Sequence, residues 1–266
     1  MTRQNIFQIV NGIPNMLNFR NSGQGAGVGS MYVKQINPTY LWSFIGVPNQ
    51  IPLPNGSGLV ANDSIASVPL NYNNGSSGGG ITNINTNSLQ INQGSSQKIL
   101  LTASFGSLNS FTFSFWANTA IAFSTQRILE LFSSSGNTFQ IDVGANNNYP
   151  VVYSTIGNNN TTAVSLLANT IAGVALQHIC VTVNGTTLKL YINGISVYSG
   201  TFPAAGMNSF FIANKDNPNG TFNCNCTIAD IKIYNFVMSQ TQITALFNAN
   251  QAVNAVIPTV NFINLY

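Results

Sequence analysis

Two closely spaced Asn-Gly dipeptides constrain the fold of this chain more than any other feature of its sequence. They are Asn184-Gly185 and Asn193-Gly194, both in the segment 177–194. Asn and Gly accept the positive φ values that both central residues of a type I′ turn require, and this turn connects antiparallel strands. The segment therefore predicts three consecutive antiparallel strands joined by two tight turns.

A second strand signal is the alternation of side chains in the segment 110–117, SFTFSFWA. Successive side chains of a strand point to opposite faces of its sheet. The pattern predicts a strand with one buried face, in which Phe111, Phe113 and Phe115 lie opposite Thr112, Ser114 and Trp116.

The segment 227–234 alternates in the same way. It predicts a strand with Ile228, Asp230, Lys232 and Tyr234 on one side and Ala229, Ile231 and Ile233 on the other. For Asp230 we expect a structural carboxylate, paired with Lys232 or accepting backbone donors.

The segment that follows predicts a helix. Ser239-Gln-Thr-Gln242 has the form of a capping box, in which the Ser hydroxyl and the Gln side chain each pair with the other's backbone N–H. A short helix through Ile243, Leu246 and Phe247 should follow it.

Further strands are predicted at 127–132, 138–143, 149–154 and 209–213, separated by Gly- and Asn-rich turns. This rhythm is typical of a β-sandwich. The Asn-, Gly- and Ser-rich segment 71–87 is predicted to be a loop.

Composition excludes several classes of function. Charged residues make up 5% of the chain, and the eight Lys and Arg residues are scattered, although the formal net charge is +3. Nucleic-acid binding and polybasic membrane binding both need clustered cations, so neither partner is expected. The longest weakly polar run, 170–183, is too short and too interrupted to span a membrane. The first residues lack the apolar core of a secretory signal, which predicts synthesis in the cytoplasm without export by that route.

The three cysteines do not indicate a disulfide framework or a zinc site. Cys180 lies in a predicted strand and is expected to be a buried thiol, while Cys224 and Cys226 are too close for an easy mutual disulfide. The chain has a single histidine and no Cys-x-x-Cys pair, so a zinc ligand set is not expected.

The segment 176–194 resembles the signature strand pair of the concanavalin A-like, laminin-G-like jelly rolls, Trp-His-His-Val-Ala-Val-Thr-Tyr-Asp-Gly followed by Leu-Tyr-Val-Asp-Gly. Leu176 replaces the tryptophan, and Asn184 and Asn193 replace aspartates. The positions that match are His178, Thr182, Gly185, Leu190, Tyr191 and Gly194.

Other segments extend this resemblance. The segment 111–116 is similar to the family's Phe-Thr-Ile-Ser-Phe-Trp strand, 228–247 to its closing strand and short helix, and 40–44 to its aromatic-rich opening strand. The resemblance implies an all-β, two-sheet antiparallel jelly-roll sandwich over residues 39–250, with one short helix near the C-terminus. Residues 1–38 are expected to form an N-terminal arm. Residues 251–266 are expected to form an extended tail that can add a strand to an exposed edge, its own or a partner's.

Jelly rolls of this family include both glycan-binding modules and β-glucanases, so the fold does not choose between them. Glycoside hydrolysis needs two carboxylates flanking the scissile bond. The chain has one glutamate, Glu130, and four aspartates, with no Glu-x-Asp-x-x-Glu strand. His178, the only possible base of a Ser-His-Asp device, is expected to be structural. We therefore expect no catalytic residues.

Two kinds of binding site are candidates. Calcium, a frequent ligand in the family, would be held at Asp63 or Asp216, although both are also typical turn residues that bond their own backbone. A sugar would need an aromatic platform with amides nearby, which Tyr149, Tyr153 or Tyr198 could supply. No other cofactor is expected.

Two functions remain after these exclusions. One is a structural protein of a large assembly, such as a minor capsid or surface-decorating protein of a virion; the other is a carbohydrate-binding, lectin-like adhesion module. The near-absence of charge and the absence of a secretion signal favour the first. We then expect the protein at the virion or particle surface, with neighbouring subunits and glycans as candidate partners.

Overall fold

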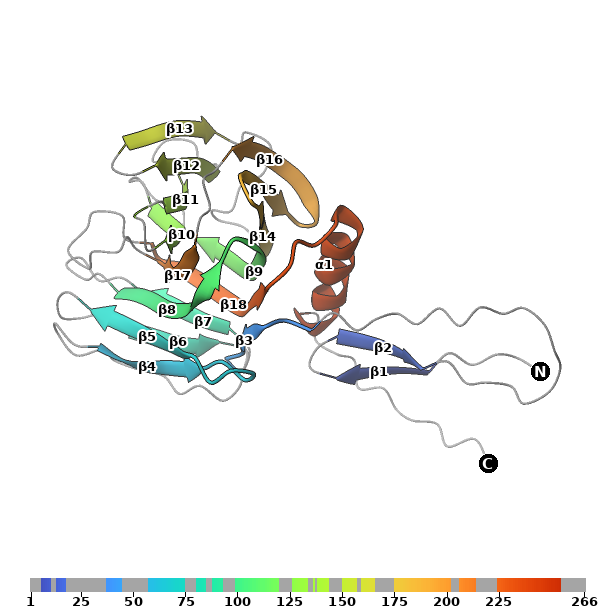
Figure 1. Cartoon of the computed structure of the whole chain (residues 1–266). Helices are drawn as coiled ribbons and strands as arrows, with labels where there is room; N and C mark the ends of the chain where they lie inside the picture. The colour runs from blue at the N-terminus through green and yellow to red at the C-terminus, as the bar shows by residue number, and fades with distance from the viewer. Residues whose placement is uncertain are drawn as a thin grey trace, which may run out of the picture.

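The structure is a computed structural model that describes residues 6–10, 13–17, 37–44, 57–74, 80–84, 88–92, 99–119, 126–133, 136, 138–143, 150–156, 159–165, 175–201, 206–213 and 224–254. Most of these residues form two antiparallel sheets that pack face to face (Figure 1). This arrangement confirms the predicted all-β, two-sheet jelly-roll sandwich. None of the helices in the described part of the chain is long and apolar enough to cross a membrane.

The first sheet, here called the β10 sheet, has eight strands. In spatial order these are β13 (Asn159–Ser165), β12 (Pro150–Ile156), β11 (Thr138–Val143), β10 (Gln126–Ser133), β17 (Met207–Ile212), β8 (Ile99–Leu108), β5 (Pro69–Asn74) and β4 (Ser57–Asn62).

The second sheet, here called the β9 sheet, also has eight strands. Seven follow one another as β16 (Ile195–Thr201), β15 (Thr187–Ile192), β14 (Gln177–Asn184), β9 (Ser110–Thr119), β18 (Cys226–Tyr234), β7 (Ser88–Asn92) and β6 (Gly80–Ile84). The eighth, β3 (Tyr40–Trp42), pairs with the later half of β18, whereas β7 pairs with its earlier half.

Strand β6 and residues 71–74 of β5 lie in the segment 71–87, which we predicted to be a loop, so that prediction was wrong at these positions. Three of the six residues of β5 (PLNYNN) are Asn, which is depleted in strands, whereas β6 (GITNI) contains β-branched Ile and Thr. Pairing with β8 stabilises β5 despite its composition, since tertiary contacts routinely override local propensity in sheets, and β6 pairs with β7.

Aromatic rings fill the space between the two sheets. Phe210 of β17 contacts Phe113 of β9 and Trp42 of β3, with ring centroids 5.1 and 5.4 Å apart. All three side chains are fully buried. Rings from both sheets therefore interdigitate, and they contribute hydrophobic burial together with edge-to-face packing.

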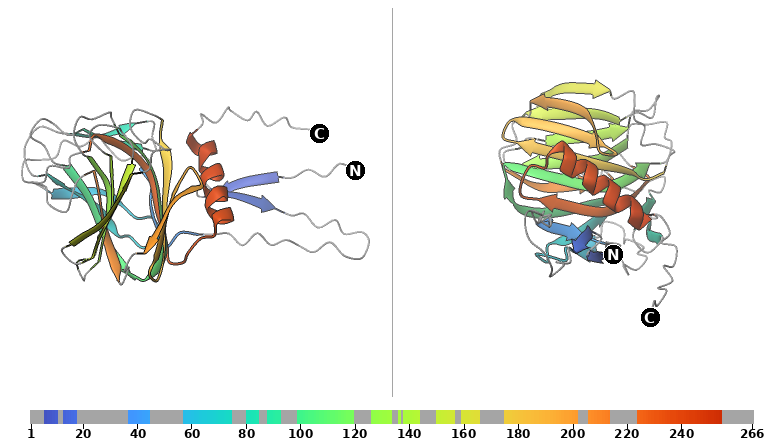
Figure 2. Two further views of the ribbon diagram at one scale, coloured as in Figure 1. Left: turned by 90° about the horizontal axis from the view of Figure 1, so that it is seen from above. Right: turned by 90° about the vertical axis from the view of Figure 1, so that its right-hand side faces the viewer.

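The outward face of β9 differs from the prediction. Phe111, Phe113 and Phe115 point into the core as expected, but Thr112, Ser114 and Trp116 are buried as well, with at most 4% exposed. The helix α1 (Gln240–Asn254) lies across the outside of the β9 sheet (Figure 2). The strand is thus buried on both faces, because a later part of the chain covers the second.

A bulge in β18 breaks the predicted alternation of that strand. Its pairing with β9 shifts between Ala229 and Lys232, and Asp230 has a φ of 55°. Ile228 therefore lies in the core together with Ile231 and Ile233, not on the side of Lys232 and Tyr234. The extra residue reverses the faces, a consequence of the period of two.

The two Asn-Gly turns form the predicted hairpins, but only the second has positive φ at both centres. Asn193 and Gly194 have φ values of 52° and 76°, as a type I′ turn requires. In the first hairpin Asn184 still pairs with Thr187 as a strand residue, and Gly185, with φ 57°, is the first central residue. A single positive φ at that position is typical of a II′ turn.

The predicted capping box and helix are both present. The backbone N–H of Ser239 donates to Gln242 Oε1 at 2.8 Å, and that of Gln242 donates to Ser239 Oγ at 3.3 Å. The helix continues to Asn254, four residues into the predicted tail. Outside the sandwich, β1 (Ile6–Val10) and β2 (Ile13–Leu17) form a hairpin beside α1 that the sequence analysis missed (Figure 2).

Candidate functional site

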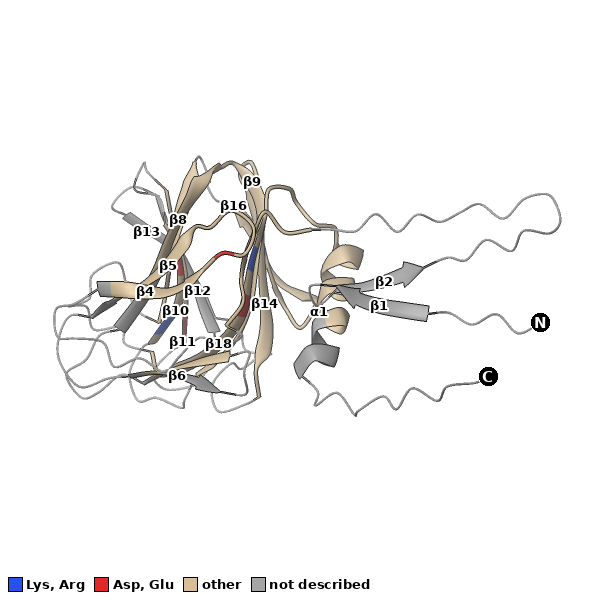
Figure 3. Ribbon diagram, turned by 90° about the horizontal axis from the view of Figure 1, so that it is seen from below, with Lys and Arg blue, Asp and Glu red and all other residues tan. Residues whose placement is uncertain are grey.

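Most charged side chains of the described chain lie inside the protein. Of the seven that the structure describes, five are at most 4% exposed: Asp63, Arg127, Glu130, Asp142 and Lys232. Asp230 has an intermediate burial and Lys189 is exposed. Few positions of the described ribbon carry a charged residue (Figure 3). Ordinary soluble proteins place such residues on the surface. The described surface therefore consists almost entirely of neutral amides, hydroxyls and apolar groups.

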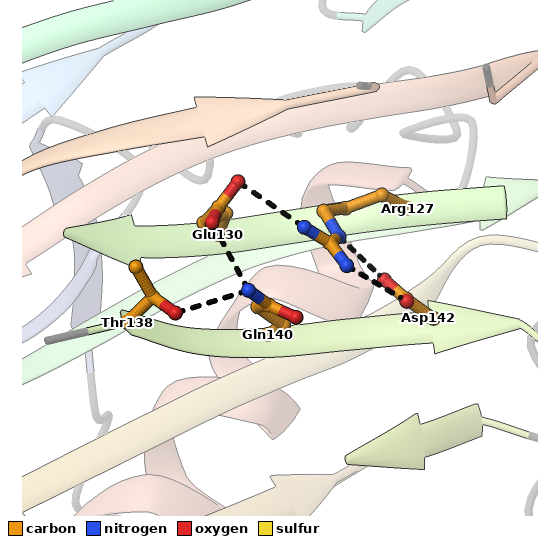
Figure 4. Close-up of polar contacts among 5 residues, drawn as sticks. All are labelled: Arg127, Glu130, Thr138, Gln140 and Asp142. Carbon is orange, nitrogen blue, oxygen red and sulfur yellow. Dashed lines mark hydrogen bonds and ion pairs between the residues drawn. The ribbon is translucent and has the colours of Figure 1, made fainter. Parts of the chain in front are cut away.

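Three of the buried charges form one network on the β10 sheet (Figure 4). Arg127 of β10 donates two hydrogen bonds to Asp142 of β11, from Nε to Oδ1 at 2.7 Å and from Nη2 to Oδ2 at 3.1 Å. Its Nη1 lies 3.3 Å from Glu130 Oε2. The guanidinium thus binds Asp142 in the two-nitrogen fork geometry that suits a carboxylate and contacts Glu130 with its third nitrogen.

Two neutral residues of β11 complete the network. Gln140 Nε2 donates to Glu130 Oε1 at 3.1 Å and to Thr138 Oγ1 at 3.0 Å. In the pairing of β10 with β11, Glu130 lies opposite Gln140, and Leu129 and Leu131 lie opposite Ile141 and Phe139 of the core. The network therefore occupies the face of the β10 sheet that points away from the sandwich core.

The two carboxylates of the network affect the pKa of Arg127. Burial by itself lowers the pKa of Arg127, but the hydrogen bond and negative charge of Asp142, and then Glu130, outweigh it and raise that pKa above its ordinary value. Both carboxylates serve as acceptors for one cation. This is the chemistry of a structural ion cluster, not of a separated acid and base.

A second group of buried polar side chains, separate from the Arg127 network, lies between the β9 sheet and α1. His178 is fully buried, its Nε2 lies 2.8 Å from Ser114 Oγ, and its ring contacts Trp116 and Phe247. Burial, and to a lesser extent the charge of Lys232, lower the pKa of His178 to about 3. The imidazole is thus neutral at ordinary pH, and its contacts agree with the structural role expected for it.

Lys232 pairs with Asp230, Nζ to Oδ2 at 2.5 Å, as one of our two expectations for Asp230 stated. Apolar side chains of α1 and the segment before it cover this second group, and Met238, Ile243 and Leu246 cluster there with Cys180 and Tyr234. Cys180 is the buried thiol that the sequence predicted, and burial raises its pKa.

Asp63, a calcium candidate, caps backbone donors. Its Oδ1 accepts from the N–H of Leu41 at 2.5 Å and of Ile65 at 3.2 Å, and its Oδ2 accepts from Ala66. These bonds satisfy both carboxylate oxygens of a side chain that is 2% exposed. Among the residues that the structure describes, no three or more His, Cys, Asp and Glu side chains gather as a metal site would require.

The other candidate residues fall in different places. Asp216 and Tyr149 lie outside the described residues. The backbone of Tyr153 pairs with Gln140 in the β10 sheet, whereas Tyr198 belongs to β16 of the β9 sheet, where it is partly buried against the core. The described chain thus places Tyr153 and Tyr198 on separate sheets.

The sequence analysis did not predict the Arg127 network, because it considered the acidic residues only as catalytic candidates and not as partners of Arg127. Arg127 and Glu130 lie three residues apart in β10, but Asp142 reaches Arg127 only through the register of β10 with β11. The polar alternation Thr138, Gln140 and Asp142 within one predicted strand was a signal that could have located its face.

A two-sheet jelly roll with a lectin-like fold and buried charges is the class that these observations define. Over residues 92–244 the chain matches the family Laminin_G_3 of the concanavalin A-like lectin/glucanases superfamily. The match covers more than half of the 266 residues, and the chain belongs to this superfamily. No curated protein matches it.

Solved structures share the fold at low identity. The binding domain of botulinum neurotoxin serotype G is 16% identical, with a TM-score of 0.56, over 82% of this chain and 52% of that one. A type C botulinum neurotoxin structure, described by cell entry through two ganglioside molecules, is 14% identical (TM-score 0.54; 77% and 51% covered). A mutant Trypanosoma rangeli sialidase with trans-sialidase activity is 14% identical (TM-score 0.55; 80% and 33% covered). The chain thus spans about half the length of the toxin structures.

Proposed function

We propose that this chain is a non-catalytic structural protein of a large assembly, with its lectin-like domain at the surface of a virion or similar particle. The minor capsid or surface-decorating role expected from the sequence is the concrete form of this proposal. The observation that carries it is the burial of charge: five of the seven described charged side chains lie inside the protein.

The low surface charge of the described part of the chain favours association. Like charges on free proteins keep copies apart, and low surface charge promotes association and precipitation. Amide and hydroxyl groups can instead form hydrogen bonds to a neighbouring subunit without the cost of desolvating ions. The surface therefore suits permanent contact with other subunits.

The buried acids support a non-catalytic role. Glu130 and Asp142 share the guanidinium of Arg127 and accept its hydrogen bonds. A glycosidase needs one carboxyl group protonated as an acid and one ionised on the other side of the bond. Two carboxylates that share one buried guanidinium are not placed on the two sides of a scissile bond, which does not suit that division of roles.

The alternative is a carbohydrate-binding adhesion module. It is favoured by the superfamily match and by the fold shared with a toxin whose cell entry involves gangliosides and with a toxin binding domain solved with rat synaptotagmin II. Tyr149, Tyr153 and Tyr198 are its proposed ligand-contacting residues. Asp216 and Asp63 are its proposed calcium positions, although Asp63 would have to release backbone donors to bind the ion.

One experiment separates the two functions. The full chain is purified, its self-association is measured by sedimentation across concentration, and its binding to a glycan array is measured with and without calcium. The assembly proposal predicts concentration-dependent oligomers and no defined sugar. A soluble monomer that binds one class of glycan would overturn that proposal in favour of the adhesion module.

A further inference from the structure

The edges of the two sheets are protected unequally. An edge strand presents unpaired backbone groups, and soluble proteins guard such strands with charges, prolines, bulges or covering loops. Among the described strands, three edges of this sandwich carry an extra, bulged residue: Val60 in β4, Thr161 in β13 and Val197 in β16. A bulge twists an edge and hinders pairing with another strand.

A fourth edge is covered by a loop. Strand β3 borders the β9 sheet, and its Leu41 donates its N–H to Asp63 and accepts the N–H of Ser64 at 2.9 Å. The buried carboxylate of Asp63 thus occupies a backbone donor that a further strand would use. This contact explains why one of the few acids of the chain lies here.

Strand β6 has none of these devices in the part of the chain that the structure describes. It pairs with β7 in unbroken register from Gly80 to Ile84, and its sequence GITNI contains no charge and no proline. Within the described strands it is the regular edge of the β9 sheet, and the remaining backbone groups suit an added strand.

The chain itself contains a segment of the matching kind. Helix α1 begins beside β16, where Gln240 and Thr244 donate to the carbonyl of Gly194, and runs obliquely across the sheet toward the β7 and β6 side (Figure 2). After Asn254 the sequence continues past Pro258 with TVNFINLY, which has no charge. The eight residues after Pro258 would span about 26 Å when extended.

The composition of this segment points to a second copy as its origin. Its apolar residues fall on both faces of an extended strand: Val260, Phe262 and Tyr266 on one, Ile263 and Leu265 on the other. A strand at the edge of a lone domain needs only one apolar face, whereas runs without alternation are typical of strands buried on both sides. Contact between two subunits supplies the second cover.

We propose that the β6 edge is a subunit interface that takes up residues 259–266 of a second copy as an additional strand. This inference rests on the proposed assembly function and names the surface that would serve it. Main-chain hydrogen bonds would provide the affinity, so ionic strength would matter little. Repetition of the contact would link copies into a larger assembly.

Two cysteine variants of the full chain test the interface. Thr82→Cys and Ile263→Cys are made separately, mixed in equal amounts and oxidised with a glutathione redox buffer. Intact mass spectrometry should find a disulfide-linked pair of one Thr82→Cys copy and one Ile263→Cys copy. Thr201→Cys, on the exposed end of the bulged β16, is the matched control and should give at least about tenfold less cross-linking with Ile263→Cys.

A proline variant gives a second readout. Ile263→Pro should weaken self-association at least about tenfold, because proline removes a ladder donor and restricts φ. Ala255→Pro, outside the segment, should leave self-association unchanged. Equal cross-linking of Ile263→Cys with Thr82→Cys and with Thr201→Cys would overturn the interface. A double variant that carries both Thr82→Cys and Ile263→Cys distinguishes a link within one chain from a link between two. The interface is also overturned if the disulfide forms only within single copies of this double variant. Oligomers that persist in Ile263→Pro overturn it too while leaving the assembly function standing, whereas a monomeric parent chain contradicts both.

Discussion

At the scale of single residues, two features of this protein depend on the particular amino acid present. The Asn193-Gly194 turn is one, since it both closes a hairpin and docks a helix. Gly194 has φ 76°, and a Cβ there would lie 3.3 Å from the Cα of Thr244 in α1. The glycine is thus needed for its backbone conformation and for the close approach of α1.

Gly194→Ala should therefore destabilise the protein more than Gly185→Ala. Both glycines have positive φ, which costs an alanine about 1 kcal/mol, but a Cβ at Gly185 meets nothing within 4 Å. Urea unfolding should show a loss of unfolding free energy of about 1 kcal/mol for Gly185→Ala and about 2–3 kcal/mol for Gly194→Ala, because the second substitution also crowds α1. Equal losses would contradict the docking role of the turn.

The Arg127 network is the second case. Arg127→Met leaves two buried carboxylates without their cation and should cost about 3–5 kcal/mol of unfolding free energy. Asp142→Asn keeps Glu130 as a partner for the guanidinium and should cost less. Lys189→Met, which removes an exposed cation, is the control and should change stability by less than about 0.5 kcal/mol.

Among the elements, α1 shows how a helix converts a sheet face from surface to core. Its side chains bury His178 and Trp116 on the β9 sheet, and Phe247 stacks on Trp116 with ring centroids 5.8 Å apart. Its N-terminus is fixed by the capping box of Ser239 and Gln242. The helix therefore determines the environment of the only histidine.

Acid should loosen this contact. The pKa of His178 is about 3 in the folded protein and 6.5 ordinarily, so the unfolded chain binds the proton more readily. The histidine's contribution is complete above pH 6.5 and decreases as the pH falls toward 3, by about 1.4 kcal/mol per unit. Between pH 6.5 and 5 the parent should lose about 2 kcal/mol more stability than His178→Gln in urea unfolding. Parallel pH profiles of the two proteins would argue against a buried neutral imidazole.

The cap of α1 gives a smaller effect. Ser239→Ala removes the acceptor of the Gln242 N–H and should cost about 1 kcal/mol. Hydrogen exchange should quicken in the first turn of α1 while the core strand β9 stays protected. Thr187→Ala, at an exposed position outside the helix, should leave the exchange of α1 unchanged.

At the scale of the whole molecule, the inward placement of charge is the property that most affects behaviour. With five of seven described charges buried, the described surface has little that salt can screen. Self-association should change less than about twofold between roughly 0.05 and 0.5 M NaCl, as measured by sedimentation. A decline of tenfold or more would show that ionic contacts hold the copies together.

Local patterns in the sequence predicted the strands, the second Asn-Gly turn and the capped helix, and resemblance to a family predicted the jelly roll. These features depend on period, turn chemistry and capping, which neighbouring residues determine. The same patterns placed Ile228 on the wrong face, because a bulge at Asp230 leaves no mark in the alternation. They also missed β6 and residues 71–74 of β5, because the Asn-, Gly- and Ser-rich composition of the segment 71–87 concealed two short strands that pair with β7 and β8.

By itself, then, the sequence determined the class of the fold and the scarcity of charge, since hydrophobic period and composition are properties of the chain alone. Tertiary structure decided where the few charges lie and which edges are closed. Arg127 meets Asp142 only once β10 and β11 pair in one register, and Asp63 meets Leu41 of β3, 22 residues earlier, only in the folded chain. The physical reason is that register and helix docking are chosen by the burial of the whole core, and no local window of residues contains that information.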